Sequence, residues 1–240
     1  MPMRDLSAAA TLDLWQTAEE LEAAERPLAL AASASDEPIE ELARLPLGRR
    51  DARVLELHAA LGGRALEATA ACPACGEPAE FEVEVDALRS RGRRQARPEP
   101  VEACGLVVAW RPPDSTDVAA AAATGDQAAA ERVLLSRCVT SSHGGELPAE
   151  ARTAVAAAMA ECDPLAEVLV DVACPACETV FVADLDLGSF VWAEVRARAL
   201  RLLRDVDALA RAYGWTEAEV LALDERRRNA YLELVREGAR

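Results

Sequence analysis

The spacing of apolar residues predicts helices over the first quarter of the chain. Residues 11–25 carry one apolar face and one acidic face, which is the pattern of an amphipathic helix. The apolar face consists of Leu12, Trp15, Ala18 and Leu21. Pro27 marks a break, and residues 49–61 predict a second helix that Gly62 closes. The patterns together indicate an N-terminal helical region over residues 1–63.

The same helical period returns in residues 190–240. One face of the predicted helix carries Val191, Val195, Ala199, Leu202, Val206, Leu209 and Tyr213. Gly214 is placed to end this helix. Thr216 and Glu219 have the spacing of a capping box for a short helix, and Asp224 can cap a last helix.

Between these regions the apolar period changes to two, which is typical of strands. Phe81, Val83 and Val85 alternate with glutamates and predict a hairpin whose turn is the segment CPACGEP. Val168, Val170 and Val172 lead into a second CPAC, after which residues 180–187 alternate again. Two similar hairpins are therefore predicted.

The segment between the two hairpins is predicted to contain a loop, a strand and several helices. A basic loop over residues 89–100 leads into a strand over residues 101–110, which a pair of prolines ends. Alanine-rich helices are expected after it, at residues 116–123, 127–139 and 148–162, with Asp126 as an N-cap of the second.

These patterns predict an α+β fold that is mainly helical, with two β-hairpins forming a zinc-ribbon-like unit. Three regions are expected: residues 1–63, residues 64–189 with an inserted helical segment at about 112–163, and residues 190–240.

The net charge limits the classes of partner that the chain is expected to bind. A formal charge of -16 repels phosphate backbones and anionic lipid headgroups, so we expect no nucleic-acid and no membrane binding. Acidic residues interrupt the apolar positions of the N-terminus, so we expect neither a signal peptide nor a membrane span there. The expected location is therefore the cytoplasm.

Four of the seven cysteines form the strongest chemical signal. Two CPAC segments carry Cys72, Cys75, Cys174 and Cys177, each pair in the same hairpin context. Zinc prefers four ligands in a tetrahedron, which two such tips supply, and four thiolates leave no open position for water. We therefore predict one structural Zn²⁺ and no catalytic metal. The competing interpretation is a pair of redox dithiols, which would require a helix to begin at the first cysteine of each pair.

The remaining candidates give no catalytic site. Cys104, Cys138 and Cys162 stand alone among apolar residues and are expected to be buried. His58 lies on a predicted helix, where a packed or surface role is expected, and His143 lies near two serines but without the geometry of a triad. No nucleotide-binding or hydrolase motif is present, so neither an enzyme nor a small-molecule substrate is predicted.

Two arginine clusters could contact partners. One holds Arg89, Arg91, Arg93, Arg94 and Arg97, and it is expected to be a solvated loop, the alternative being a dock for phosphate or an acidic partner. The other, at residues 226–228, opens the last predicted helix against its dipole, which suggests recognition of another chain.

The C-terminal run RLLRDVDALARAYGWTEAEVLALDERRRNAYLELV resembles the tail of baseplate proteins of contractile injection systems, a group related to the baseplate hub assembly chaperones of T-even phages. The resemblance is carried by Tyr213, Gly214, Trp215, Thr216, Glu217, Glu219, Leu221, Arg227, Arg228, Tyr231 and Leu232. Residues 45–63, both CPAC hairpins and the start of the C-terminal helix are similar to the zinc-ribbon members of that group. The chain departs from the pattern at Asp224–Glu225, where the family often has Ser-Pro.

The resemblance implies a non-enzymatic structural or chaperone-like role in the baseplate or hub of a phage-tail-like particle. Its partners would be baseplate, hub or spike proteins, and the particle would be a second location beside the cytoplasm. The partner-binding residues would be Tyr213, Trp215, Arg227, Arg228 and Tyr231. From the residues alone, the aromatic side chains could equally pin the terminal helices together.

Two other functions compete with this one. A zinc-ribbon adaptor that binds nucleic acid or the transcription machinery would fit the paired C-x-x-C motifs but not the charge. A thiol oxidoreductase would fit the C-x-x-C motifs only if their thiols are reactive.

Overall fold

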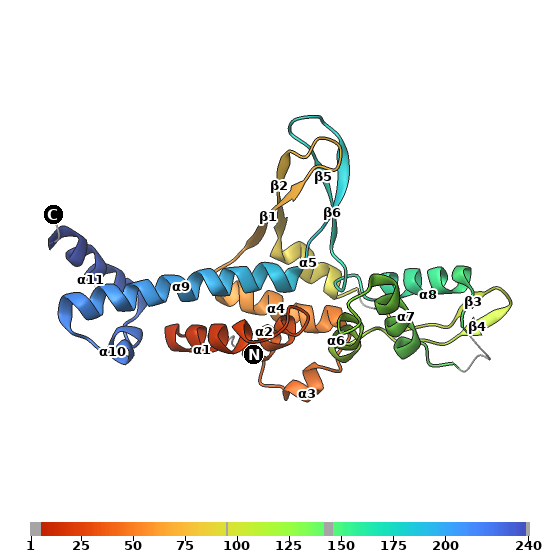
Figure 1. The fold of residues 1–240 in the computed structure, drawn as a ribbon, viewed down its shortest axis with the longest axis horizontal. Helices are drawn as coiled ribbons and strands as arrows, with labels where there is room; N and C mark the ends of the chain where they lie inside the picture. Colours follow the sequence, from red (N-terminus) through yellow and green to blue (C-terminus); the bar gives the residue numbers. More distant parts are fainter. Residues whose placement is uncertain (1–5, 95, 142–145, 239–240) are drawn as a thin grey trace.

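The computed structural model describes residues 6–94, 96–141 and 146–238. Over these ranges the chain has an α+β fold that is mainly helical, with three two-stranded antiparallel sheets. A long helix runs from the middle of the molecule to one end, two hairpins rise from the middle of the molecule, and smaller units lie at either end (Figure 1). No helix within the described ranges combines the length and the apolar character needed to cross a membrane.

Four helices form the central body: α1 (Ala8–Glu19), α2 (Arg26–Ser33), α4 (Leu47–Ala60) and the first half of α9 (Leu187–Tyr213). A one-turn helix, α3 (Ile39–Leu42), connects α2 to α4. Their shared core contains Leu14, Ala18, Leu30, Ala31, Val54, Leu57, Val191, Trp192 and Val195. Pro27 is the predicted break between helices. It lies in the first turn of α2, where its fixed φ favours the start of a helix.

A buried histidine joins two helices of this body to the first strand. His58 on α4 is 3% exposed, and its Nδ1 lies 2.6 Å from Glu194 Oε2 on α9. Its Nε2 lies 3.1 Å from the carbonyl oxygen of Ala65, at the start of the first strand. The hydrogen bond with Glu194 raises the pKa of His58 above its usual value. The expected packed role is confirmed, and the acidic partner is new.

Both predicted hairpins around the CPAC segments are confirmed. Strand β1 (Ala65–Ala71) pairs antiparallel with β2 (Pro78–Glu84), and β5 (Leu169–Ala173) pairs with β6 (Val180–Asp184). The two hairpins stand side by side with their tips together (Figure 1). Between them lies a small apolar cluster of Ala79, Val172 and Ala183, flanked by Phe81 and Phe181.

The predicted basic loop after the first hairpin is partly wrong, because α5 (Val85–Gly92) includes Arg89 and Arg91. Two apolar side chains of this helix, Val85 and Leu88, are buried at the base of the hairpins. That second core consists of Leu55, Leu66, Val85, Leu88, Leu165, Val168, Leu185 and Leu187. It packs the hairpins onto the helical body.

The predicted strand over residues 101–110 is also wrong, because the segment folds into a short hairpin of β3 (Val101–Ala103) and β4 (Leu106–Val108). Cys104 and Gly105 make its turn with positive φ angles of 53° and 73°. The predicted alanine-rich helices are confirmed as α6 (Ser115–Ala122), α7 (Gln127–Cys138) and α8 (Ala149–Cys162). A separate core, which includes Val108, Trp110, Leu135 and Val155, holds this unit together.

The chain ends in α10 (Glu217–Leu221) and α11 (Glu225–Gly238), which pack on the second half of α9. The predicted stop signals are confirmed: Gly214 takes the left-handed conformation, and Thr216 and Glu219 form a capping box. Asp224 Oδ1 accepts a hydrogen bond of 2.9 Å from the backbone N–H of Arg227. Sequence signals therefore define each boundary of this region.

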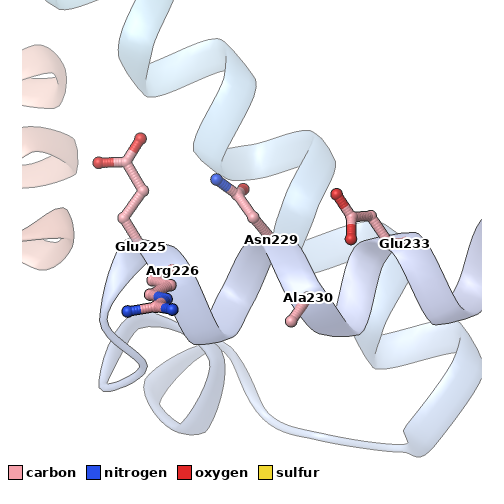
Figure 2. A pocket seen from close by; sticks show the side chains of 5 residues that line it. All are labelled: Glu225, Arg226, Asn229, Ala230 and Glu233. Carbon is pink, nitrogen blue, oxygen red and sulfur yellow. The ribbon is translucent and has the colours of Figure 1, made fainter.

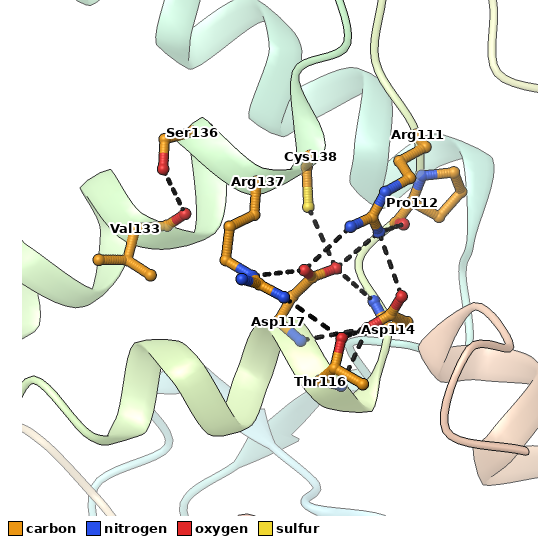
Figure 3. A network of polar contacts seen from close by, with 9 residues as sticks. All are labelled: Arg111, Pro112, Asp114, Thr116, Asp117, Val133, Ser136, Arg137 and Cys138. Atoms are coloured by element: carbon orange, nitrogen blue, oxygen red, sulfur yellow. Dashed lines mark hydrogen bonds and ion pairs between the residues drawn. The ribbon is translucent and has the colours of Figure 1, made fainter. Parts of the chain in front are cut away.

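A charged network joins α6 to α7 (Figure 3). The side chain of Asp117 is fully buried and accepts two hydrogen bonds from Arg111, of 2.6 and 2.9 Å, and one of 2.8 Å from Arg137. Burial alone would raise the pKa of Asp117, but the bonds from Arg111, the Asp114 backbone N–H and Arg137 outweigh burial and lower that pKa to about 2. The network is a structural clamp.

Asp117→Asn should destabilise the protein by about 3 kcal/mol at pH 7, because it leaves two guanidinium groups without their buried carboxylate. Urea denaturation measures this change. Asp126→Asn, at the exposed N-cap of α7, is the matched control and should change stability by less than about 0.5 kcal/mol, since Asn caps as well as Asp. The contribution of Asp117 to the free energy of unfolding should disappear as pH falls from 3.8 towards 2. Equal losses of stability in Asp117→Asn and Asp126→Asn would contradict the structural role of the network.

Candidate metal centre

The two hairpin tips have the same backbone structure. In the first tip, the N–H of Cys72 donates to the carbonyl of Glu77 (2.9 Å) and the N–H of Gly76 donates to the carbonyl of Cys72 (2.8 Å). In the second, Cys174 donates to Thr179 and Glu178 donates to Cys174, each at 3.0 Å. Each tip thus presents two sulfurs on one side of a tight turn. The first cysteine of each pair is buried and the second is exposed.

The tips bring all four sulfurs together. Cys72 Sγ lies 3.7 Å from Cys177 Sγ, and Cys75 Sγ lies 3.6 Å from Cys174 Sγ. All four atoms lie within 4.8 Å of one another. Both of these pairs join different hairpins, and their sulfur–sulfur separations are far longer than the ~2.05 Å of a disulfide. The sequence prediction that the two pairs meet is confirmed, and the four cysteines form a candidate metal site.

Hydrogen bonds from the backbone or a side chain reach the sulfurs of both exposed cysteines, Cys75 and Cys177. The hydroxyl and backbone N–H of Thr179 both hydrogen-bond to Cys177 Sγ, and they lower the pKa of that thiol to about 6. The backbone N–H of Glu77 acts in the same direction on Cys75, but the neighbouring thiols outweigh it and raise the pKa of Cys75 to about 12. Four thiolates at this separation would repel one another strongly, so all four thiols can ionise only when a cation is bound among them. A metal ion supplies that positive charge.

The tips do not have the structure expected of redox dithiols. A reactive C-x-x-C places its first cysteine at a helix N-terminus, whereas Cys72 and Cys174 directly follow strands β1 and β5. Both of these cysteine residues are 2% exposed. The geometry therefore favours metal binding over thiol exchange.

The other predicted residues are scattered. Cys138 and Cys162 are buried as expected, but Cys104 is exposed, because it lies in the turn between β3 and β4 and hydrogen-bonds to Glu150 rather than packing in a strand. His143 and its neighbour Ser142 lie outside the described residues. His58 lies on α4 in the helical body and is not part of the group that the four cysteines form.

The aromatic residues of the C-terminal motif gather into one stack. Tyr213 and Trp215 stack with ring centroids 4.9 Å apart, and Tyr231 meets the Trp215 ring edge-on at 4.8 Å. The stack pins α11 to the end of α9, yet Tyr213 remains 41% exposed. A partner-binding role for these three residues stays a prediction.

The two arginines of the motif have different environments. Arg227 is exposed at the start of α11. Arg228 is 6% exposed and donates a 3.2 Å hydrogen bond to Asp205 on α9, so it holds the two helices together inside the chain. The ion pair with Asp205 offsets the unfavourable interaction between the positive charge of Arg228 and the dipole of α11.

Sequence reasoning missed the residues that support the sulfurs. Glu77 and Thr179 each follow the second cysteine by two positions and supply its hydrogen bonds. Gly76 and Glu178 take equivalent places and have positive φ angles of 78° and 59°. Aligning the two CPAC segments would have revealed these pairs.

Comparisons with known proteins identified no similar protein. Searches of protein-family models, of curated proteins and of solved structures found no match to this chain.

Glu178→Gly should stabilise the protein by about 1 kcal/mol, because Glu178 occupies a left-handed conformation that favours glycine. Gly76→Ala should cost about 1 kcal/mol at the equivalent place, where a Cβ would meet nothing within 4 Å and the cost is conformational only. Thermal and urea denaturation measure both changes. Glu178→Ala removes the same charge but keeps the strain, and a gain equal to that of Glu178→Gly would refute this explanation.

Proposed function

We propose that Cys72, Cys75, Cys174 and Cys177 hold one structural zinc ion. Zinc–thiolate bonds of about 2.3 Å put the sulfurs of a regular tetrahedron about 3.8 Å apart. The cross-hairpin separations of 3.6 and 3.7 Å fit that value closely. Four sulfur ligands and no oxygen ligand favour zinc over magnesium or calcium, which prefer oxygen.

The ion would act as a tie between two parts of the chain. Bound zinc would stabilise the negative charge of the thiolates and link hairpins whose cysteines are 99 and 105 residues apart in sequence. With four protein ligands it would have no open position for substrate or water. The proposed role is therefore structural.

We further propose that the chain is a non-enzymatic structural or assembly component of the baseplate or hub of a contractile, phage-tail-like injection system. The proposal rests on one observation, the C-terminal motif that resembles that family. Its residues belong to one continuous unit, in which Tyr213, Trp215 and Tyr231 stack and the capping box begins α10. Exposed aromatic surface in a chain with 4% aromatic residues supports a role in contacting baseplate, hub or spike proteins.

Cys72→Ser or Cys174→Ser should remove bound zinc and destabilise the protein by at least about 3 kcal/mol, since zinc binding in small sites contributes on the order of 10 kcal/mol. Elemental analysis of protein purified under reducing conditions, together with thermal denaturation, measures both effects. Cys104→Ser is the matched control, because this exposed cysteine lies on the distant β3–β4 turn. Full zinc content in either tip variant would rule out the four-sulfur site.

The tagged full-length chain should co-purify with baseplate, hub or spike subunits when it is co-expressed with those of a contractile particle from the same genome. Trp215→Ala together with Tyr231→Ala should lower their recovery at least about tenfold, as expected for aromatic hot spots, with helix content checked by circular dichroism. Val107→Ala, which truncates a side chain 63% exposed at the opposite end of the molecule, should have no effect. Failure of the unmodified chain to recover any of these subunits would contradict the proposed function.

A further inference from the structure

A cleft rich in arginine lies between α9 and α11. Its volume is about 370 Å³, and five arginines line it: Arg198, Arg201, Arg204, Arg228 and Arg236. The acidic residues of its wall are Asp205 and Glu225. Five positive charges against two negative ones stand out in a chain whose net charge is -16.

Two of the arginines are already neutralised inside the cleft. Arg228 is 7% exposed at its side chain and pairs with Asp205 at 3.2 Å. Arg198 Nη2 lies 3.8 Å from Glu225 and Nη1 donates to the carbonyl of Leu61. These contacts use both of the carboxylates that line the cleft.

The other three arginines are available to a ligand. Arg201, Arg204 and Arg236 are exposed, and none forms an ion pair with a residue in the described ranges. Arg198, Arg201 and Arg204 follow one another at steps of three along α9, and like charges at that spacing destabilise a helix. A bound anion would relieve this repulsion while forming charge-assisted hydrogen bonds.

We propose that this cleft binds the carboxylates of an acidic peptide segment presented by a partner protein. Guanidinium groups match carboxylates with two parallel hydrogen bonds, and the volume accommodates a few side chains, not a nucleic-acid duplex. The inference is independent of the proposed function, because it rests on the charges and shape of the cleft alone.

The rim of the cleft favours a peptide over nucleic acid. Figure 2 shows the next face of α11, where a shallow hollow shares Glu225 and Asn229 with the cleft and is also lined by Arg226, Ala230 and Glu233. This hollow holds two carboxylates and one guanidinium, so a polyphosphate chain leaving the cleft would cross a surface of net negative charge. A peptide carries neutral backbone between its carboxylates, and the Asn229 amide can both donate to it and accept from it.

Fluorescence anisotropy with the full-length protein tests the proposal. The probe is a fluorescein-labelled ten-residue peptide that alternates glutamate with leucine, and its glutamine counterpart is the control ligand. The glutamate peptide should bind saturably and weaken with added salt, because exposed ion pairs are screened. Arg201→Gln with Arg204→Gln should reduce the affinity about tenfold and leave the fold intact, since both side chains are exposed and form no ion pair with a described residue.

The matched control is Arg196→Gln with Arg211→Gln, which removes the same charge from α9 outside the cleft, where these arginines pair with Glu19 and Asp207. This variant should bind within about twofold of the unmodified protein if the site is local. Equal loss in both double variants, equal binding of the glutamine peptide, or no binding at millimolar peptide would overturn the proposal. Displacement of the peptide by single-stranded DNA at a lower concentration than unlabelled peptide would also overturn it.

Discussion

The meeting of four sulfurs at two hairpin tips is the contact on which the arrangement of the hairpins depends. An isolated two-stranded hairpin is marginally stable in water, and the apolar cluster between these two is small, with Ala79, Val172 and Ala183 as its buried members. Val180 and Val182 on β6 are 66% and 60% exposed, so little apolar area is buried along that strand. Cross-linking the tips through one ion would supply the stability that packing does not.

Helix α9 connects this site to the C-terminal unit. It begins at Leu187, soon after β6 ends at Asp184, and its 27 residues span about 40 Å at 1.5 Å per residue. Its first half is buried in the helical body and is held by the His58–Glu194 contact. Its second half carries the aromatic stack and the arginine cleft. The hairpins and the C-terminal surface are thus positioned by one rigid element.

Local signals in the sequence were sufficient for most of the fold. Strict alternation around Val83 and Val172 predicts the hairpins, and the repeated CPAC predicts the cysteine cluster. The β3–β4 turn was missed because Cys104–Gly105 lies inside an apolar run that reads as one strand. Helix α5 was missed because only Val85 and Leu88 anchor an otherwise polar, arginine-rich segment.

Contacts between distant segments could not be predicted in the same way. The His58–Glu194 pair spans 136 residues, and the Arg228–Asp205 pair depends on how α11 crosses α9. The arginines of the cleft are spread over two helices and become one site only when those helices pack. Zinc K-edge X-ray absorption on reduced, purified protein tests the four-sulfur site most directly. We expect one zinc per chain with four sulfur neighbours at about 2.3 Å. Absence of zinc, or a first shell containing nitrogen or oxygen, would contradict it.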